Sequence, residues 1–166
     1  DVCSSDLTDE AISFIAENHD KKFFLHFAHY GVHTPLQAKS AMVQKYREMP
    51  KESQQGNPVY AAMVESIDES VGRVVETLQD LGIRDRTCII FASDNGGFYK
   101  ATNNAPLRAN KGAYYEGGIR VPLIIDWPGT IENGCVIDQP VISMDLYPTC
   151  LAMTGVPLCP EQDRKS

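Results

Sequence analysis

A long amphipathic repeat between two short apolar runs most constrains what this chain can fold into. From residue 59 to residue 81, apolar side chains recur at spacings of three and four, at positions 59, 63, 67, 71, 74, 78 and 81. This period predicts a helix with one buried face, and Gly82 is a suitable residue to end it. The runs at residues 23–28 and 87–92 are mostly apolar, as in strands buried on both faces. Strand, long helix and strand in this order predict an α/β fold with a mostly parallel sheet flanked by helices.

Weaker patterns predict the remaining elements. Thr8 followed by two acidic residues is typical of a helix start, so a first helix is expected from Thr8 to about Asn18. We also expect a short helix at residues 40–48, a strand at 121–127, an edge strand at 135–142, and a last helix from Ser143 or Asp145 to about Met153 that Gly155 ends.

Composition excludes several classes of function. Of the 166 residues, 43% are hydrophobic and 22% are charged, which is typical of a globular domain. The net charge of −7 and the absence of a basic stripe with interleaved aromatic residues argue against a nucleic-acid partner. No run of 18 apolar residues occurs, so the sequence predicts no membrane span.

The first seven residues have an unusual sequence. Residues 1–7 read Asp-Val-Cys-Ser-Ser-Asp-Leu, the peptide that the end of a common short-read sequencing adapter would encode. We therefore expect a non-native leader at residues 1–7, one domain at 8–160 and a tail at 161–166. The alternative is a short polar N-terminus that matches by chance.

Polar side chains follow the expected strands at the point where each one ends. His33 lies beyond the run at residues 23–28, and Asp94 and Asn95 directly follow the run at 87–92. Lys111 lies in a glycine-rich loop further along the chain. Because sites in parallel α/β sheets gather outside the carboxyl ends of the strands, we expect these four side chains to converge. A cation held by oxygen ligands beside a basic side chain suits an enzyme that binds and polarises an oxyanion ester.

Each of these features also has an ordinary structural interpretation. Asp-Asn-Gly-Gly is a common turn sequence, Lys111 could be a solvated surface lysine, and His33 could be a loop residue without a task. Ion pairs that brace the loop are expected for three further charged residues: Arg108, Glu116 and Arg120. Packing is the expected role of three aromatic residues: Tyr114, Tyr115 and Trp127.

Taken together, the segments resemble the sulfatase family of the alkaline-phosphatase-like superfamily. The similar segments occur in family order: a strand-and-histidine segment at 23–37, a metal-binding turn at 93–97, a lysine loop at 104–122 and a following helix at 145–157. The resemblance covers residues 8–160. It implies an incomplete alkaline-phosphatase-like domain, the later part of a sulfatase catalytic domain.

The resemblance also implies a role for each candidate residue. Asp94 and Asn95 would supply half of a site for one divalent cation, usually calcium in this family, and hard oxygen donors suit that ion. Lys111 and His33 would both bind the sulfate ester and act in catalysis. Lys111 would neutralise charge on the sulfate oxygens, and His33 would protonate the departing alcohol.

The family nucleophile is a formylglycine made from a cysteine or serine in a C/S-x-P-S-R motif, and this chain contains no such motif. The paired aspartates that open the family's metal site are absent as well. Both belong to the N-terminal half of the domain, which would be the partner of this segment. We therefore expect the chain alone to be inactive in sulfuric ester hydrolysis, while the full-length protein acts on a sulfated small molecule or glycan. The family further implies export to the periplasm, the lysosome or the cell exterior.

Two other functions remain open at this point. A phosphodiesterase or phosphonate monoester hydrolase of the same superfamily uses similar cation chemistry. A non-catalytic binding protein that kept the fold but lost the nucleophile is the third possibility. The nucleophile motif, upstream of residue 8, would discriminate among them.

Overall fold

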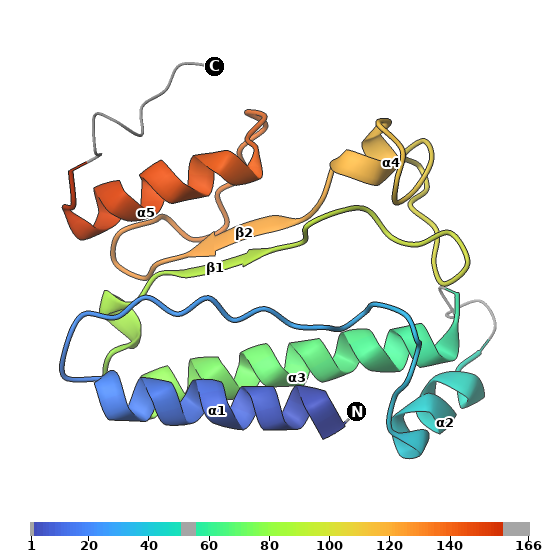
Figure 1. The fold of residues 1–166 in the computed structure, drawn as a ribbon, viewed down its shortest axis with the longest axis horizontal. Coiled ribbons are helices and arrows are strands. Elements are labelled where there is room, and N and C mark those ends of the chain that lie inside the picture. The colour runs from blue at the N-terminus through green and yellow to red at the C-terminus, as the bar shows by residue number, and fades with distance from the viewer. Residues whose placement is uncertain (1, 51–55, 158–166) are drawn as a thin grey trace. The chain divides into compact units, whose positions relative to one another are not determined.

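A computed structural model describes residues 2–50 and 56–157. The chain forms two compact units, Asp1–Glu132 and Asn133–Ser166, and each is described by itself. The first unit contains, in chain order, α1 (Val2–Asn18), α2 (Ser40–Glu48), α3 (Pro58–Asp80), the 3₁₀ turn η2 (Arg84–Arg86), β1 (Ile89–Ala92), α4 (Glu116–Ile119) and β2 (Leu123–Asp126). The second contains the 3₁₀ turn η3 (Ser143–Asp145) and α5 (Leu146–Thr154) (Figure 1).

The predicted long helix is confirmed as α3. It begins where the Asn57 side chain accepts a hydrogen bond from the Val59 backbone N–H at 2.8 Å, with Pro58 in the first turn. It is followed by Gly82, whose φ of 64° is the left-handed conformation that glycine adopts at low cost. The predicted short helix at residues 40–48 is confirmed as α2.

One hydrophobic cluster joins α1 and α3 of the first unit to β1. Its fully buried members come from α1, α3 and the turn after α3: Ile15, Leu78 and Ile83. Partly buried side chains pack around them: Phe23, Leu25, Val74, Leu81 and Ile89. Burial of large aliphatic side chains is the main favourable term in folding, so this cluster anchors α1 and α3 to each other.

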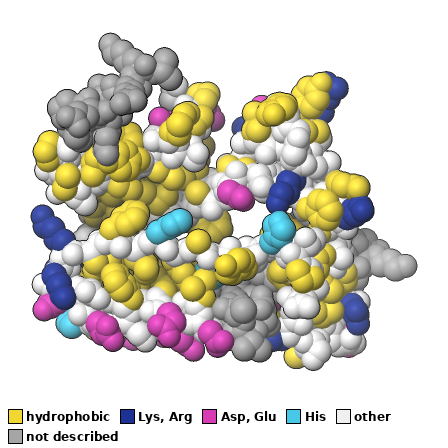
Figure 2. Space-filling view, viewed as in Figure 1, with side chains coloured by type: hydrophobic (Ala, Val, Ile, Leu, Met, Phe, Trp, Pro, Cys, Tyr) yellow, Lys and Arg dark blue, Asp and Glu magenta, His cyan; other side chains and the backbone are white. Residues whose placement is uncertain are grey.

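The segment at residues 23–30 is extended but is not a strand, so the prediction for residues 23–28 is wrong. Burial alternates along it: Phe23 and Leu25 pack against the core, whereas Phe24 and Tyr30 are 72% and 83% exposed. No backbone hydrogen bond joins it to β1 within the described residues. An apolar run predicts an extended, partly buried segment, but it does not indicate whether a neighbouring strand pairs with the backbone of that segment. In the view of Figure 2, hydrophobic side chains gather across the middle of the visible face, and acidic side chains lie along its lower edge.

The described strands form a two-stranded antiparallel sheet. β1 pairs with β2 in a register that sets Ile89 opposite Asp126 and Ala92 opposite Leu123. The predicted strands at 87–92 and 121–127 are therefore confirmed in position, but the expected parallel pairing is absent from the part of the chain that the structure describes. Parallel pairing would require ladder hydrogen bonds from residues 23–28, which stay out of the sheet.

The first helix begins before Thr8, so the prediction that Thr8 caps it is wrong. α1 runs from Val2, and residues 2–7 continue the helix in the N-terminal direction. Thr8 is buried, and its hydroxyl lies 2.7 Å from the hydroxyl of Ser70 on α3. The Ser70 hydroxyl lies 3.3 Å from Nε2 of His29 in the extended segment. This chain of polar groups joins α1, α3 and the extended segment.

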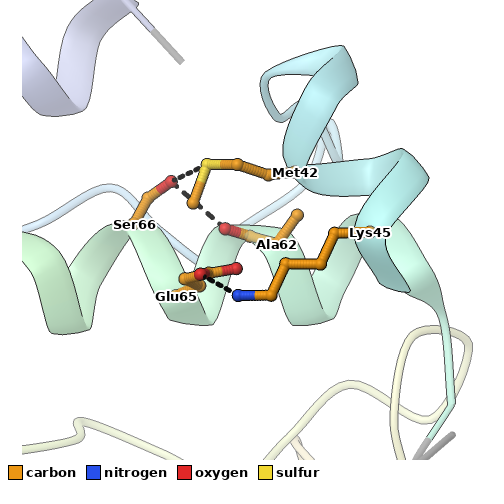
Figure 3. A network of polar contacts seen from close by, with 5 residues as sticks. All are labelled: Met42, Lys45, Ala62, Glu65 and Ser66. Carbon is orange, nitrogen blue, oxygen red and sulfur yellow. Dashed lines mark hydrogen bonds and ion pairs between the residues drawn. The ribbon is translucent and has the colours of Figure 1, made fainter. Parts of the chain in front are cut away.

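Polar contacts also join α2 to α3 (Figure 3). Lys45 of α2 forms an ion pair with Glu65 of α3. The Ser66 hydroxyl lies 3.1 Å from the backbone oxygen of Ala62, one turn earlier, and 3.6 Å from the sulfur of Met42. The Lys45 contact lowers the pKa of Glu65, because the ammonium stabilises the charged carboxylate.

In the second unit, the predicted last helix is confirmed as η3 followed by α5. The Ile142 backbone N–H donates to the Asp145 carboxylate at 2.8 Å, and Gly155 ends the helix with a φ of 72°. The predicted edge strand at residues 135–142 is absent, because these residues are exposed and form no ladder. The predicted domain end at 158–160 and the predicted tail at 161–166 lie outside the described residues. Within them, no helix combines the length and hydropathy needed to cross a bilayer.

The buried polar chain predicts a dependence of stability on pH. Desolvation lowers the pKa of His29 below its usual 6.5, so the unfolded chain binds a proton at a pH where the folded chain does not. Stability should therefore be constant above about pH 6.5 and fall as the pH drops toward the folded-state pKa. Urea unfolding between pH 7.5 and pH 5 measures this decline. His29→Gln, which retains a hydrogen-bonding side chain but does not titrate, should flatten it, and an equal decline in both proteins would contradict the assignment.

Candidate active site

The loop between β1 and β2 holds three of the four candidate residues. Beyond the ladder, the Ser93 backbone N–H donates to the Pro122 carbonyl at 3.3 Å, and the Gly96 N–H donates to the Gly118 carbonyl at 2.9 Å. Antiparallel pairing thus continues past the strands and sets the turn that follows β1 beside the segment that precedes β2. Asp94 and Asn95 lie in that turn.

A further backbone contact draws Lys111 to the same turn. The Lys111 N–H donates to the Gly97 carbonyl at 3.1 Å, two residues beyond Asn95. The Lys111 side chain is exposed, and none of the salt bridges among the described residues involves it. Its ammonium is therefore not committed to an ion pair in the part of the chain that the structure describes.

Close backbone packing makes this loop depend on glycine. A Cβ on Gly96 would lie 1.9 Å from the Gly117 carbonyl oxygen, and one on Gly117 would lie 2.0 Å from the Ala109 oxygen. A Cβ on Gly118 would lie 2.0 Å from the Ala113 oxygen. These distances leave no room for any side chain, so the glycines let the two ends of the loop approach each other.

Asp94 and Asn95 fit one side of a site for a hard cation. The Asp94 carboxylate is exposed, and Asn95 is half-buried with its side-chain N–H donating to the Gly96 carbonyl at 3.2 Å. That bond uses a hydrogen of the amide nitrogen, so the amide oxygen is the atom that could bind a cation. Oxygen donors of this kind suit calcium or magnesium. No group of three or more His, Cys, Asp or Glu side chains that could hold a metal occurs among the described residues, so the pair by itself would supply only part of a coordination shell.

His33 lies in the turn before α2 and is exposed. Its Nδ1 lies 2.8 Å from the Thr34 carbonyl, which can only accept, so Nδ1 carries the hydrogen. Nε2 is therefore the nitrogen that remains to exchange a proton with a ligand.

The His33 turn and the Lys111 loop are both anchored on the first half of α3. Gly31 lies against Ile67, and the Ala101 carbonyl accepts a hydrogen bond from the Asn57 N–H at 3.4 Å. Ten residues of helix separate these anchor points, which corresponds to about 15 Å along its axis. The structure thus brings Asp94, Asn95 and Lys111 into one loop, while no hydrogen bond joins His33 to that loop among the described residues.

The bracing residues behave only partly as expected. Arg120 pairs with Glu116 at 3.5 Å, as predicted. Arg108 instead lies over the ring of Tyr115 at 3.8 Å from its centre, a cation–π contact that the sequence did not indicate. Tyr114 is 97% exposed, so the expectation that it packs is wrong.

One residue of the loop had no role assigned from the sequence. Asn104 lies in the polar run Thr-Asn-Asn at residues 102–104, where an asparagine is ordinarily interpreted as a local turn former. In the structure its side chain contacts three separate residues across the loop, Gly97, Ala109 and Asn110. The only sequence signal was its position between two glycine-rich segments.

Comparison with known proteins agrees with this fold. A sequence model of the sulfatase family matches residues 2–156. A sulfatase of Formosa agariphila is 38% identical over 96% of this chain and 32% of its own length. Mouse N-acetylgalactosamine-6-sulfatase is also 38% identical, over 95% of this chain and 29% of its own. The crystal structure of Ps i-CgsB in complex with k-i-k-neocarrahexaose matches with a TM-score of 0.87 and 38% identity, covering 98% of this chain and 36% of that one.

Fold and sequence therefore define a segment of an alkaline-phosphatase-like α/β domain, and the predicted fold class is confirmed. The chain belongs to the sulfatase family. It spans about a third of the length of the relatives that it matches.

The packing of the loop predicts opposite effects for two glycine-to-alanine substitutions. Gly96→Ala should destabilise the chain by about 1–3 kcal/mol, because its Cβ would overlap the Gly117 carbonyl oxygen. Gly72→Ala is the matched control, since Gly72 lies inside α3 with open space around it, and alanine there should stabilise by about 0.5–1 kcal/mol. Urea unfolding of both variants measures the difference. Equal effects would show that the loop does not require glycine at position 96.

Proposed function

We propose that this chain forms the later part of a sulfatase catalytic domain and that the full-length protein hydrolyses sulfuric esters, carbohydrate sulfates in particular. The observation that carries the proposal is the hydrogen bond from the Lys111 backbone to Gly97, which ties an uncommitted lysine to the turn that bears Asp94 and Asn95. A cationic side chain next to a pair of hard oxygen ligands is a suitable arrangement for binding an oxyanion.

In this proposal Lys111 and His33 have different roles in the hydrolysis of the sulfate ester. The Lys111 ammonium contacts the sulfate oxygens and offsets the charge that develops there in the transition state. His33 donates a proton from Nε2 to the bridging oxygen, so that the alcohol leaves as a neutral molecule. This transfer matters most for a sugar alcohol, which is a poor leaving group when unprotonated.

Asp94 and Asn95 would hold one divalent cation, which we propose to be calcium. When bound, the ion supplies positive charge that polarises the sulfate group. The formylglycine nucleophile and the remaining ligands would come from the part of the domain that precedes this segment. We propose this preceding part of the domain as the partner with which the present chain completes the site.

The names of the relatives support a carbohydrate substrate. One curated relative is an N-acetylgalactosamine-6-sulfatase, and one structural neighbour was solved in complex with a neocarrahexaose. We extend this substrate class to the present chain and propose a sulfated glycan, handled by an exported enzyme. A phosphodiesterase, a phosphonate monoester hydrolase or a non-catalytic binding protein are the alternative outcomes of the test.

The different roles of His33 and Lys111 predict how the loss of activity in each variant depends on the leaving group of the substrate. In the full-length protein, His33→Ala should lower kcat by about 10²- to 10⁴-fold on a sugar sulfate, because the alkoxide then leaves unprotonated. On 4-nitrophenyl sulfate the loss should be much smaller, since nitrophenolate leaves without a proton. Lys111→Ala should impair both substrates alike, because charge on the sulfate group develops in either case. Rates of sulfate and nitrophenol release measure both effects.

Two results would count against this assignment. Equal losses on the two substrates for His33→Ala would exclude it as the general acid. Hydrolysis of bis(4-nitrophenyl) phosphate without sulfate release would instead favour the phosphodiesterase, and binding of a sulfated glycan without turnover would favour the binding protein.

The incomplete coordination shell predicts the behaviour of the 166-residue chain by itself. It should release no sulfate from 4-nitrophenyl sulfate, because it has no nucleophile motif. Two oxygen ligands fall short of the six to eight that calcium takes, so calcium should bind only weakly, with a Kd above the micromolar range. Isothermal titration calorimetry with calcium chloride and Asp94→Asn as the control tests this expectation, and micromolar binding that Asp94→Asn abolishes would overturn it.

A further inference from the structure

Asn104 is the most connected polar side chain of the loop. Its Oδ1 accepts from the Gly97 N–H at 3.1 Å. Its Nδ2 donates toward the Gly97 carbonyl at 3.2 Å, the Ala109 carbonyl at 3.4 Å and Oδ1 of Asn110 at 3.0 Å. One half-buried amide thus contacts both backbone groups of Gly97, and its two N–H hydrogens are shared among three acceptors, two of them from the segment just before Lys111.

These contacts converge on the two segments that bear the candidate site. Gly97 belongs to the turn of Asp94 and Asn95, and its carbonyl also accepts the Lys111 N–H at 3.1 Å. Asn110 directly precedes Lys111. The Asn104 side chain therefore lies between the turn and the backbone of Lys111 and bonds to both sides.

The backbone at Gly97 is shaped to admit this amide. A Cβ on Gly97 would lie 3.0 Å from Oδ1 of Asn104 and 2.4 Å from a methyl carbon of Thr102. Any side chain at position 97 would push the amide away. The position of the Asn104 amide therefore depends on the absence of a side chain at Gly97.

We propose that Asn104 is the positioning residue for Lys111, holding its backbone against the turn of Asp94 and Asn95 so that the ammonium faces the bound sulfate. The proposal rests on the function proposed above. It requires an amide in particular, because the side chain must accept from one backbone N–H and donate to carbonyl oxygens at the same time. Aspartate has the same shape but no donor, and its carboxylate would face the Gly97 and Ala109 carbonyl oxygens.

The neighbouring asparagine provides a matched control. Asn103 is exposed, and its Oδ1 accepts only the local Ala105 N–H at 3.1 Å. Asn103→Asp keeps that acceptor and adds the same charge one residue away from the Asn104→Asp change. Any difference between the two variants therefore reports the donor contacts of Asn104 rather than the added charge.

The first measurement is hydrogen exchange on the full-length protein, followed in peptides that cover residues 93–118. Asn104→Asp keeps an oxygen that can accept from the Gly97 N–H but loses the donor contacts to the Gly97 and Ala109 carbonyls. It should therefore speed exchange at the Lys111 amide by about 10-fold, the effect of losing roughly one net hydrogen bond. Exchange in α3 should stay unchanged, which shows that the fold is intact. Asn103→Asp should match the unsubstituted protein. Unchanged exchange at Lys111 in Asn104→Asp would overturn the proposal.

The second measurement is a double-mutant cycle with Lys111→Ala, which tests whether Asn104 acts through the lysine. With Lys111 present, Asn104→Asp should lower kcat/KM on the sulfated substrate by about 10- to 100-fold, a typical result of displacing a catalytic group. In the Lys111→Ala background the same change should cost less than about 3-fold, because the group that it positions is gone. Equal factors in both backgrounds would show a general structural role and overturn the proposal. If the full-length protein releases no sulfate, the proposed function fails, while the exchange experiment still decides the role of Asn104 in the loop.

Discussion

Antiparallel pairing of β1 with β2 is the constraint on which the candidate site depends. Because the strands run in opposite directions, the residues that leave β1 lie beside those that enter β2, and single hydrogen bonds at Ser93 and Gly96 extend this pairing into the loop. The chain between them has to fold back on itself. Asp94 and Lys111 are far apart in the sequence, but the hydrogen bond from the Lys111 N–H to the Gly97 carbonyl brings their segments together. No regular secondary structure over residues 97–111 is needed for this result.

Along α3, the contacts with the buried cluster around Ile15, Leu78 and Ile83 and the anchor points of the candidate loops lie toward opposite ends. The buried cluster with Leu78 and Val74 lies toward the C-terminal end. The His33 turn and the Lys111 loop are anchored near Ile67 and Asn57, toward the N-terminal end. A helix of this length acts as a rigid bar, since its hydrogen bonds are satisfied internally. The hydrophobic cluster thus holds α1 and α3 together, while the loops that bear the candidate residues are anchored toward the other end of α3.

Local patterns in the sequence predicted the helices better than the sheet. α3 was predictable because its period, its cap and Gly82 agree. The extended segment was not, because an apolar run such as Phe23–Phe24–Leu25 indicates burial but not hydrogen-bonding partners. Asp94 and Asn95 are candidates because of their position after a strand, and that position is confirmed. Asn104 could not be predicted, because its contacts with Gly97 and Asn110 form only when distant parts of the loop meet, and no local rule encodes that meeting.

The glycine packing described above sets where this loop can vary. Positions 96, 117 and 118 accept no side chain, since a Cβ at each would lie only 1.9–2.0 Å from a carbonyl oxygen, well inside van der Waals contact. Tyr114, by contrast, projects almost entirely into solvent from the same loop. A library of variants in this loop would therefore yield folded members when diversity enters at position 114, whereas randomised glycines would mostly give misfolded protein.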